Sequence, residues 1–354
     1  MVKRVGTTFL AACAAMGIAV SAGADERTAL GGRIFMDLSY KAHDDNGVTQ
    51  DDSGAGIDVK RFYLGVTHRY DDMWSVNLTS DFNYVGGDGE TQIFVKKAYA
   101  EARFSDAATV RVGAADMPWV PFDEHLYGMR YVENTLIDRL GFGTSSDWGV
   151  HLLGALPTVG RPAYALSVVN GGGYRNPTRT KRMDVEGRVS LRPLEGLEMA
   201  AGFYVGTLGQ DTESSPADNT ASRADFLATY EAAASRWGVE YFSAKNWPVS
   251  SQDRATGYSV WGSVDVADRI AAFARYDLAQ PNRDTSPDLR DLYYHLGVDY
   301  RVDKNIDLAI AYKTERVENN GAAGTVTTSN AVLSSGPSGK GTYREVGLWT
   351  QLEF

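Results

Sequence analysis

The chain has 354 residues, a formal net charge of −10 and a mean hydropathy of −0.29. An acidic chain is a poor ligand for nucleic acid, and a single cysteine, Cys13, excludes a disulfide framework. No apolar run beyond the N-terminus approaches the roughly 20 residues that a membrane-spanning helix needs. If the chain spans a membrane, it must therefore do so as a closed barrel of strands.

The N-terminus has the pattern of a secretory signal. Lys3 and Arg4 precede an apolar run of small residues, and Ala22-Gly23-Ala24 forms a cleavage site. We therefore predict a cleaved signal over residues 1–24, which removes Cys13, and one domain over residues 25–354. Export predicts a location outside the cytoplasm.

Segments of about ten residues with apolar and polar side chains in alternation follow in chain order. The clearest, residues 73–85, sets Trp74, Val76, Leu78, Phe82 and Tyr84 against Ser75, Asn77, Thr79, Asp81 and Asn83. A period of two residues is typical of a strand with two different faces. We predict sixteen strands: 32–41, 57–70, 73–85, 93–104, 108–115, 147–155, 162–170, 183–192, 197–207, 223–233, 236–245, 256–266, 269–278, 291–301, 305–315 and 343–354.

The connections between these segments alternate between short turns and long polar loops. Asp71-Asp72 and Ser105-Asp106 are short, whereas residues 42–56, 116–146 and 316–342 are long. This asymmetry, an even number of strands and a last strand that ends on an aromatic residue are typical of outer-membrane barrels. The predicted fold class is all-β, a transmembrane antiparallel β-barrel of about sixteen strands.

Residues 92–153 contain VKKAYAEARF, then VRVGAADMPWVPFDE, then GFGTSSDWGV. This stretch of about sixty residues resembles the phosphate- and polyphosphate-selective porin family (the porin O/P group). The resemblance implies a sixteen-stranded, trimeric outer-membrane channel with passive transport, no cofactor and no metal. It also implies a long third loop folded into the lumen.

The third loop supports the same interpretation from its own residues. It is about thirty residues long, which is unusual for an idle connection. Leu126, Met129, Val132 and Leu136 recur at helical spacing and predict a helix over residues 123–138. Packing against the inner wall would bury these side chains, although a loop that caps the barrel mouth remains an alternative.

Eight basic residues are the candidate lining of the channel. Anion selectivity in the resembled family is attributed to such residues, and alternation places most of them on the polar face: Arg33, Arg61, Arg69, Lys97, Arg103, Arg111, Arg130 and Arg139. Asp37, Asp81 and Glu101 share the same strands and would weaken the field. Both a wide, weakly selective pore for small hydrophilic solutes and a preference for phosphate or other anions stay open.

Two other classes of protein are alternatives to a channel. An outer-membrane hydrolase would need a serine or aspartate working with a histidine, and none of the five histidines accompanies a serine motif. A closed structural or adhesive barrel is the second alternative. The predicted partners are small solutes or anions, the lipid bilayer, lipopolysaccharide and two further copies of the chain in a homotrimer, without nucleic acid.

Overall fold

The computed structural model describes residues 27–84, 91–336 and 339–354, so the predicted signal lies outside the described residues. Its long strands are β1 (Thr28–Asp45), β3 (Gly54–Arg69), β4 (Trp74–Tyr84), β5 (Thr91–Ser105), β6 (Ala108–Asp116), β7 (Ser146–Ala155), β8 (Ala163–Val169), β9 (Asp184–Leu194), β10 (Leu197–Gly206), β11 (Ala221–Ala232), β12 (Ser235–Lys245), β13 (Arg254–Ala267), β14 (Ile270–Gln280), β15 (Arg290–Asp303), β16 (Ile306–Glu318) and β19 (Gly341–Glu353).

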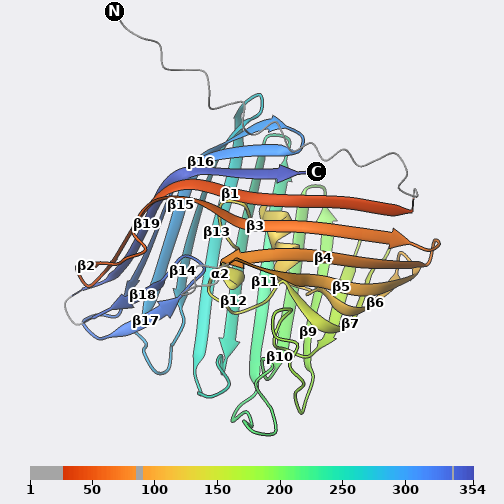
Figure 1. Cartoon of the computed structure of the whole chain (residues 1–354), viewed down its shortest axis with the longest axis horizontal. Helices are drawn as coiled ribbons and strands as arrows, with labels where there is room; N and C mark the ends of the chain where they lie inside the picture. The colour runs from red at the N-terminus through yellow and green to blue at the C-terminus, as the bar shows by residue number, and fades with distance from the viewer. Residues whose placement is uncertain (1–26, 85–90, 337–338) are drawn as a thin grey trace, which may run out of the picture.

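These strands form one closed antiparallel barrel (Figure 1). Each strand pairs with the next along the chain, and β1 closes the barrel by pairing with β19, from Arg33 opposite Glu353 to Asp45 opposite Gly341. The two-residue β2 (Val48–Thr49) joins the same sheet, which is 17-stranded with it. The predicted fold class is confirmed, and each of the sixteen predicted segments overlaps one long strand.

Strand β15 shows why the alternation appears in the sequence. Tyr294, Leu296 and Val298 are 43%, 54% and 47% exposed on the outer surface, whereas Tyr293 and His295 on the opposite face are 0% and 1% exposed. A soluble barrel would bury its large apolar residues, but here they form the outer surface. An apolar outer band around a polar interior is the pattern of a barrel surrounded by lipid.

Two β-bulges interrupt the alternation on neighbouring parts of the wall. In β3 the register passes from Arg61 opposite Phe35 to Val59 opposite Met36, which leaves Lys60 as an extra residue. In β5 it passes from Lys97 opposite Thr79 to Val95 opposite Ser80, which leaves Lys96 extra. A bulge allows two successive side chains to point to the same side, and in both places the doubled side chains are basic.

The connection between β6 and β7 contains two short helices, α1 (Val120–Tyr127) and α2 (Leu136–Arg139). The predicted single helix over residues 123–138 is therefore wrong. Gly128 ends α1 with φ +78, a backbone conformation that glycine adopts without strain, and its N–H bonds to Glu124 O. In the described part of the chain, no helix is long and apolar enough to cross a membrane.

The other long connections lie at the same end of the barrel as the start of this segment (Figure 1). The connection after β16 folds into a separate hairpin of β17 (Gly324–Thr327) and β18 (Val332–Ser335). The short turns and the C-terminus lie at the opposite end. The barrel thus has long connections at one end and short turns at the other.

Candidate functional site

Residues 117–145, called here the inner segment, touch strands around the barrel. The Trp119 N–H donates to Glu186 on β9 at 2.9 Å. The Tyr131 hydroxyl donates to Asp299 on β15, and its ring lies 6.5 Å from that of Phe35 on β1. Strands that lie far apart in the sheet can be touched by one short segment only from the inside. The inner segment therefore runs through the barrel interior.

Arg139, at the end of α2, anchors the inner segment to the wall. Its guanidinium donates to Asp277 at 3.1 Å, to Asp291 at 2.6 Å and to Glu315. All four side chains are 0% exposed. A buried cation needs such partners because losing its water is costly. Arg139 is therefore fully occupied in holding α2 against β14, β15 and β16.

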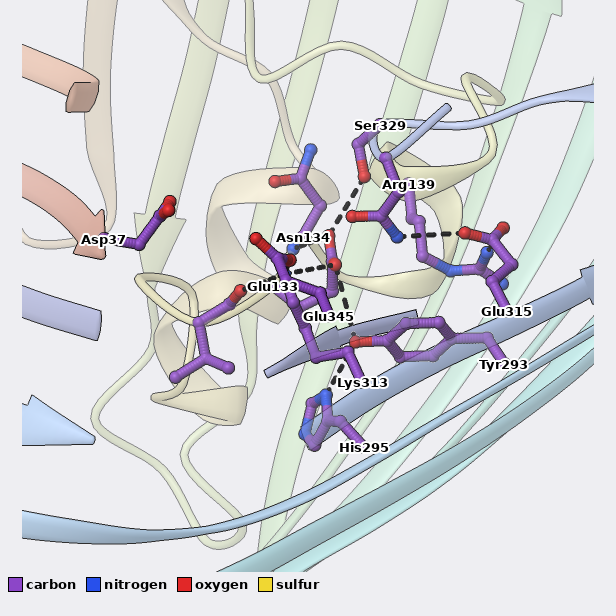
Figure 2. A network of polar contacts seen from close by, with 12 residues as sticks. Asp37, Glu133, Asn134, Arg139, Tyr293, His295, Lys313, Glu315, Ser329 and Glu345 are labelled. Atoms are coloured by element: carbon purple, nitrogen blue, oxygen red, sulfur yellow. Dashed lines mark hydrogen bonds and ion pairs between the residues drawn. The ribbon is translucent and has the colours of Figure 1, made fainter. Parts of the chain in front are cut away.

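A second anchor surrounds Glu133 (Figure 2). Lys313 on β16 lies 3.3 Å from this carboxylate and 2.7 Å from Glu345 on β19. Ser329, from the loop between β17 and β18, donates to Glu133 at 3.0 Å, and Tyr293 also points at it. Burial opposes ionisation of Glu133, but the charges of its cationic neighbours lower its pKa well below the usual range. The β17–β18 connection and the barrel wall therefore both contact Glu133 of the inner segment.

Asp123 on α1 is the least satisfied charge in the inner segment. It is 0% exposed, and both of its carboxylate oxygens are buried without a well-formed hydrogen bond. Burial raises its pKa to about 7, against the opposing effects of Thr135, Arg275 and the carboxyl group of Glu240 on β12. The docked segment therefore favours the neutral form of Asp123.

This predicts that α1 docks less firmly as the pH rises. A carboxyl group whose pKa is raised in the docked state stabilises docking fully at about pH 4 and below. This stabilisation is lost as the pH rises through about 7. For a pKa raised from about 4 to about 7, the loss of docking free energy is on the order of 4 kcal/mol. A thiol placed at Val120, which is 0% exposed, would report undocking because the predicted mature chain has no cysteine.

We expect maleimide to label Val120→Cys at least tenfold faster at pH 8 than at pH 5, relative to the same thiol in an Asp123→Asn background. The asparagine stays neutral, and the ratio cancels the pH dependence of the thiol itself. Identical pH profiles in the two backgrounds would refute the prediction.

The interior contains four cavities that share lining residues. The outer cavity, about 290 Å³, lies near the long loops and shares Arg130 with a central cavity of about 470 Å³. The central cavity shares His125 with an inner cavity of about 710 Å³. That cavity shares Arg161 and Arg192 with another of about 940 Å³ beside the short turns. Together they trace a route from one mouth toward the other.

Basic side chains outnumber acidic ones along this route. Twelve are basic: Arg33, Arg61, Lys96, Lys97, Arg103, Arg111, Arg130, Arg161, Arg175, Arg188, Arg192 and Arg236. Nine are acidic: Glu101, Asp106, Asp116, Glu124, Asp138, Glu195, Glu198, Glu231 and Glu353. The route is thus relatively positive in a chain whose net charge is −10.

The structure places the eight candidate residues in three settings. Six line the route: Arg33, Arg61, Lys97, Arg103, Arg111 and Arg130. Arg69 is exposed at the end of β3 beside a short turn. Arg139 does not face a cavity, because the anchor described above encloses it. Its expected position in the lining is corrected to a position between loop and wall.

Several of the lining residues are neutralised locally. Arg61 lies 3.3 Å from Asp81, Lys97 lies 2.6 Å from Asp116, and Arg111 lies 2.7 Å from Glu101. In contrast, four lining cations have no carboxylate within 4.0 Å among the described residues: Lys96, Arg161, Arg175 and Arg188. These four contribute most directly to a positive interior.

Six of the lining cations are not among the eight candidates predicted from the sequence. Lys96 directly precedes Lys97 in the predicted strand 93–104, and the bulge in β5 allows both side chains to line the interior. Arg161 and Arg175 lie on connections, where no periodicity applies. Arg188, Arg192 and Arg236 lie on predicted strands, and checking the polar face of residues 183–192 and 236–245 would have found them.

A family model described as Gram-negative porin matches residues 8–320. Among curated proteins, no sequence matches the chain. The family match is to Gram-negative porins and does not support the narrower resemblance to phosphate-selective porins.

Solved structures of outer-membrane proteins share the fold. An anion-selective porin from Comamonas acidovorans has a TM-score of 0.65 at 13% identity, with 92% of this chain and 99% of that chain covered. The trimer form of OmpT from Vibrio cholerae gives 0.59 at 14% identity, with 92% and 99% covered. OmpF of Salmonella typhi, in complex with daunomycin, gives 0.59 at 11% identity, with 92% and 97% covered.

Proposed function

Because the chain belongs to the Gram-negative porin family, we propose that it is a passive outer-membrane diffusion channel whose interior prefers small anions, phosphate among them, over cations. The observation that carries the preference is the set of lining cations without carboxylate partners, of which Lys96 and Arg175 lie toward the long-loop mouth. Small solutes would pass by diffusion along their gradient, without a cofactor.

The preference should be moderate. Arg61, Lys97 and Arg111 already share their charge with a neighbouring carboxylate, so each would hold a passing anion weakly. Weak holding at successive positions lets an ion leave as easily as it enters. The inner segment would narrow the route, because Arg139 holds it against the inner wall at β14, β15 and β16.

The protein would assemble as a homotrimer in the outer membrane after residues 1–24 have been removed. The apolar outer band would contact lipid, and the long loops would meet lipopolysaccharide. A solved relative in the same fold is described as a trimer, which supports this proposal. Light scattering of the detergent-solubilised protein would give the oligomeric state.

The reversal potential of the purified protein in a planar bilayer tests the function. In a KCl gradient we expect a potential that reports chloride as more permeant than potassium, and we expect added phosphate to reduce the chloride current. A potential of the opposite sign would overturn the anion preference and leave a porin of another selectivity. The absence of any channel would overturn the transport function itself.

A further inference from the structure

Aromatic rings and cations alternate where the central and outer cavities meet. Lys96 Nζ lies 4.4 Å from the centroid of the Tyr63 ring and 5.7 Å from that of Tyr174. Arg175 lies 5.6 Å from the same Tyr174 ring and 4.4 Å from the Phe94 ring. These five residues are called here the ring–cation cluster.

Lys96 is held in an unusual state for a lysine. It is 7% exposed, and its ammonium group donates to the Tyr63 hydroxyl at 3.1 Å. No carboxylate of the described residues lies within 4.0 Å of it. Buried lysines are normally paired with an acid. Here the ring faces supply part of the missing stabilisation, and the side chain lines the central cavity.

Arg175 completes the cluster from the loop between β8 and β9. It also lacks a carboxylate within 4.0 Å among the described residues, and it lines the outer cavity together with Tyr174. The Phe94 and Tyr174 rings lie 5.8 Å apart, tilted by 33°. The cluster therefore offers two cations without a carboxylate within 4.0 Å among the described residues, beside aromatic rings, in one place.

We propose that the ring–cation cluster is a binding site for small aromatic carboxylates. The proposal rests on the proposed anion channel and names a solute class for it. A carboxylate would accept charge-assisted hydrogen bonds from Lys96 and Arg175. The ring of the solute would stack on Tyr174 or Phe94 and would itself offer a face to the cations.

This chemistry distinguishes the site from a simple phosphate site. Inorganic phosphate would gain the charge interactions but would leave the ring faces unused. A saturated carboxylate of similar size would gain the charge and some apolar contact but no aromatic pairing. Aromatic pairing alone corresponds to about a fivefold difference in affinity. The expected order is therefore benzoate, then cyclohexanecarboxylate, then phosphate.

The experiment measures block of the chloride current in a planar bilayer by these three anions at equal ionic strength. We expect benzoate to reach half-block at a concentration at least fivefold below that of cyclohexanecarboxylate. Lys96→Met should weaken block by all three anions. Tyr174→Leu should abolish the advantage of benzoate, and Tyr174→Phe, which keeps the ring, should retain it.

The matched control is Lys245→Met, which removes a lysine exposed at the end of β12 and should change no half-block concentration. Equal block by benzoate and cyclohexanecarboxylate would overturn the aromatic site, and so would an unchanged benzoate advantage in Tyr174→Leu. In either case a chloride-selective reversal potential would leave the proposed function intact. A failure of that potential would instead count against the proposed function.

Discussion

Replacing Arg139 by methionine is expected to release the inner segment from the wall. The change removes one cation from among Asp277, Asp291 and Glu315 and leaves their carboxylates buried side by side. Arg275 remains, but it lies 2.7 Å from Asp277 and binds that residue already. Removing one member of a buried ionic cluster typically costs about 3–5 kcal/mol, enough to undock α2 for a measurable fraction of the time.

Labelling of a cysteine at Ile137, which is 0% exposed in α2, measures the release. We expect the thiol to react more than a hundredfold faster in Arg139→Met, with current fluctuations appearing in single-channel records. Arg139→Lys should restore little of the protection from labelling, because one ammonium group cannot bind three carboxylates in the way that a planar guanidinium does.

Arg283→Met, a change at an exposed loop arginine, is the matched control and should leave the labelling rate unchanged. Adding Asp291→Asn and Glu315→Gln to Arg139→Met should recover part of the protection, since the remaining repulsion is removed. If Arg139→Met alone labels as slowly as the parent, the cluster does not hold the segment.

The strands were predictable because the two faces of each strand meet different surroundings. On β15, Leu296 and Val298 face outward while Tyr293 and His295 face inward, and this difference forces the period of two that the sequence displays. The number of strands follows from counting such segments. Pairing between β1 and β19, at opposite ends of the chain, then follows from closure.

The bulges were not predictable by the same rule. Lys60 and Lys96 each add one residue to a strand, and a single extra residue does not disturb a pattern that is judged over ten. Strict alternation through residues 93–104 would place Lys96 on the lipid side, where a charge is costly. Two adjacent lysines within an otherwise alternating strand are therefore a usable signal for a bulge.

The role of Arg139 required contacts that the sequence does not display. Its partners Asp277, Asp291 and Glu315 lie 138, 152 and 176 residues further along the chain. Alternation indicates that each of these acids faces inward, but it does not indicate which cation of the inner segment they meet. In the sequence alone, a basic loop residue that lines a passage cannot be distinguished from one that is enclosed by acidic side chains.

Changing Lys96 to glutamate is expected to have the largest effect on ion selectivity. Lys96 has no carboxylate partner within 4.0 Å among the described residues, so its charge is not cancelled locally, and the substitution alters the interior by two charges. At about 5 Å in water-like surroundings each charge is worth about 0.8 kcal/mol. Two charges disfavour chloride by about 1.6 kcal/mol and favour potassium, so the permeability of chloride relative to potassium should fall at least tenfold.

Pairing of the new carboxylate would not rescue the anion preference. A glutamate at position 96 would attract Arg61 or Arg130, which line the adjoining cavities, and would thereby neutralise one more cation. Lys96→Met should give about half the effect in free energy. Arg103→Gln should give much less, because Arg103 is 59% exposed and lies 2.6 Å from Asp106 near the short turns.

Reversal potentials in KCl gradients at low and high ionic strength measure these changes, with Lys245→Glu as a charge reversal outside the route. Screening shortens from about 10 Å at 0.1 M salt to about 3 Å at 1 M, so the effect of Lys96→Glu should shrink at high salt. A uniform small shift for Lys96→Glu, Arg103→Gln and Lys245→Glu would mean that net charge, and not the position of Lys96, sets the selectivity. A tenfold shift confined to Lys96→Glu would place the deciding charge at the bulge in β5.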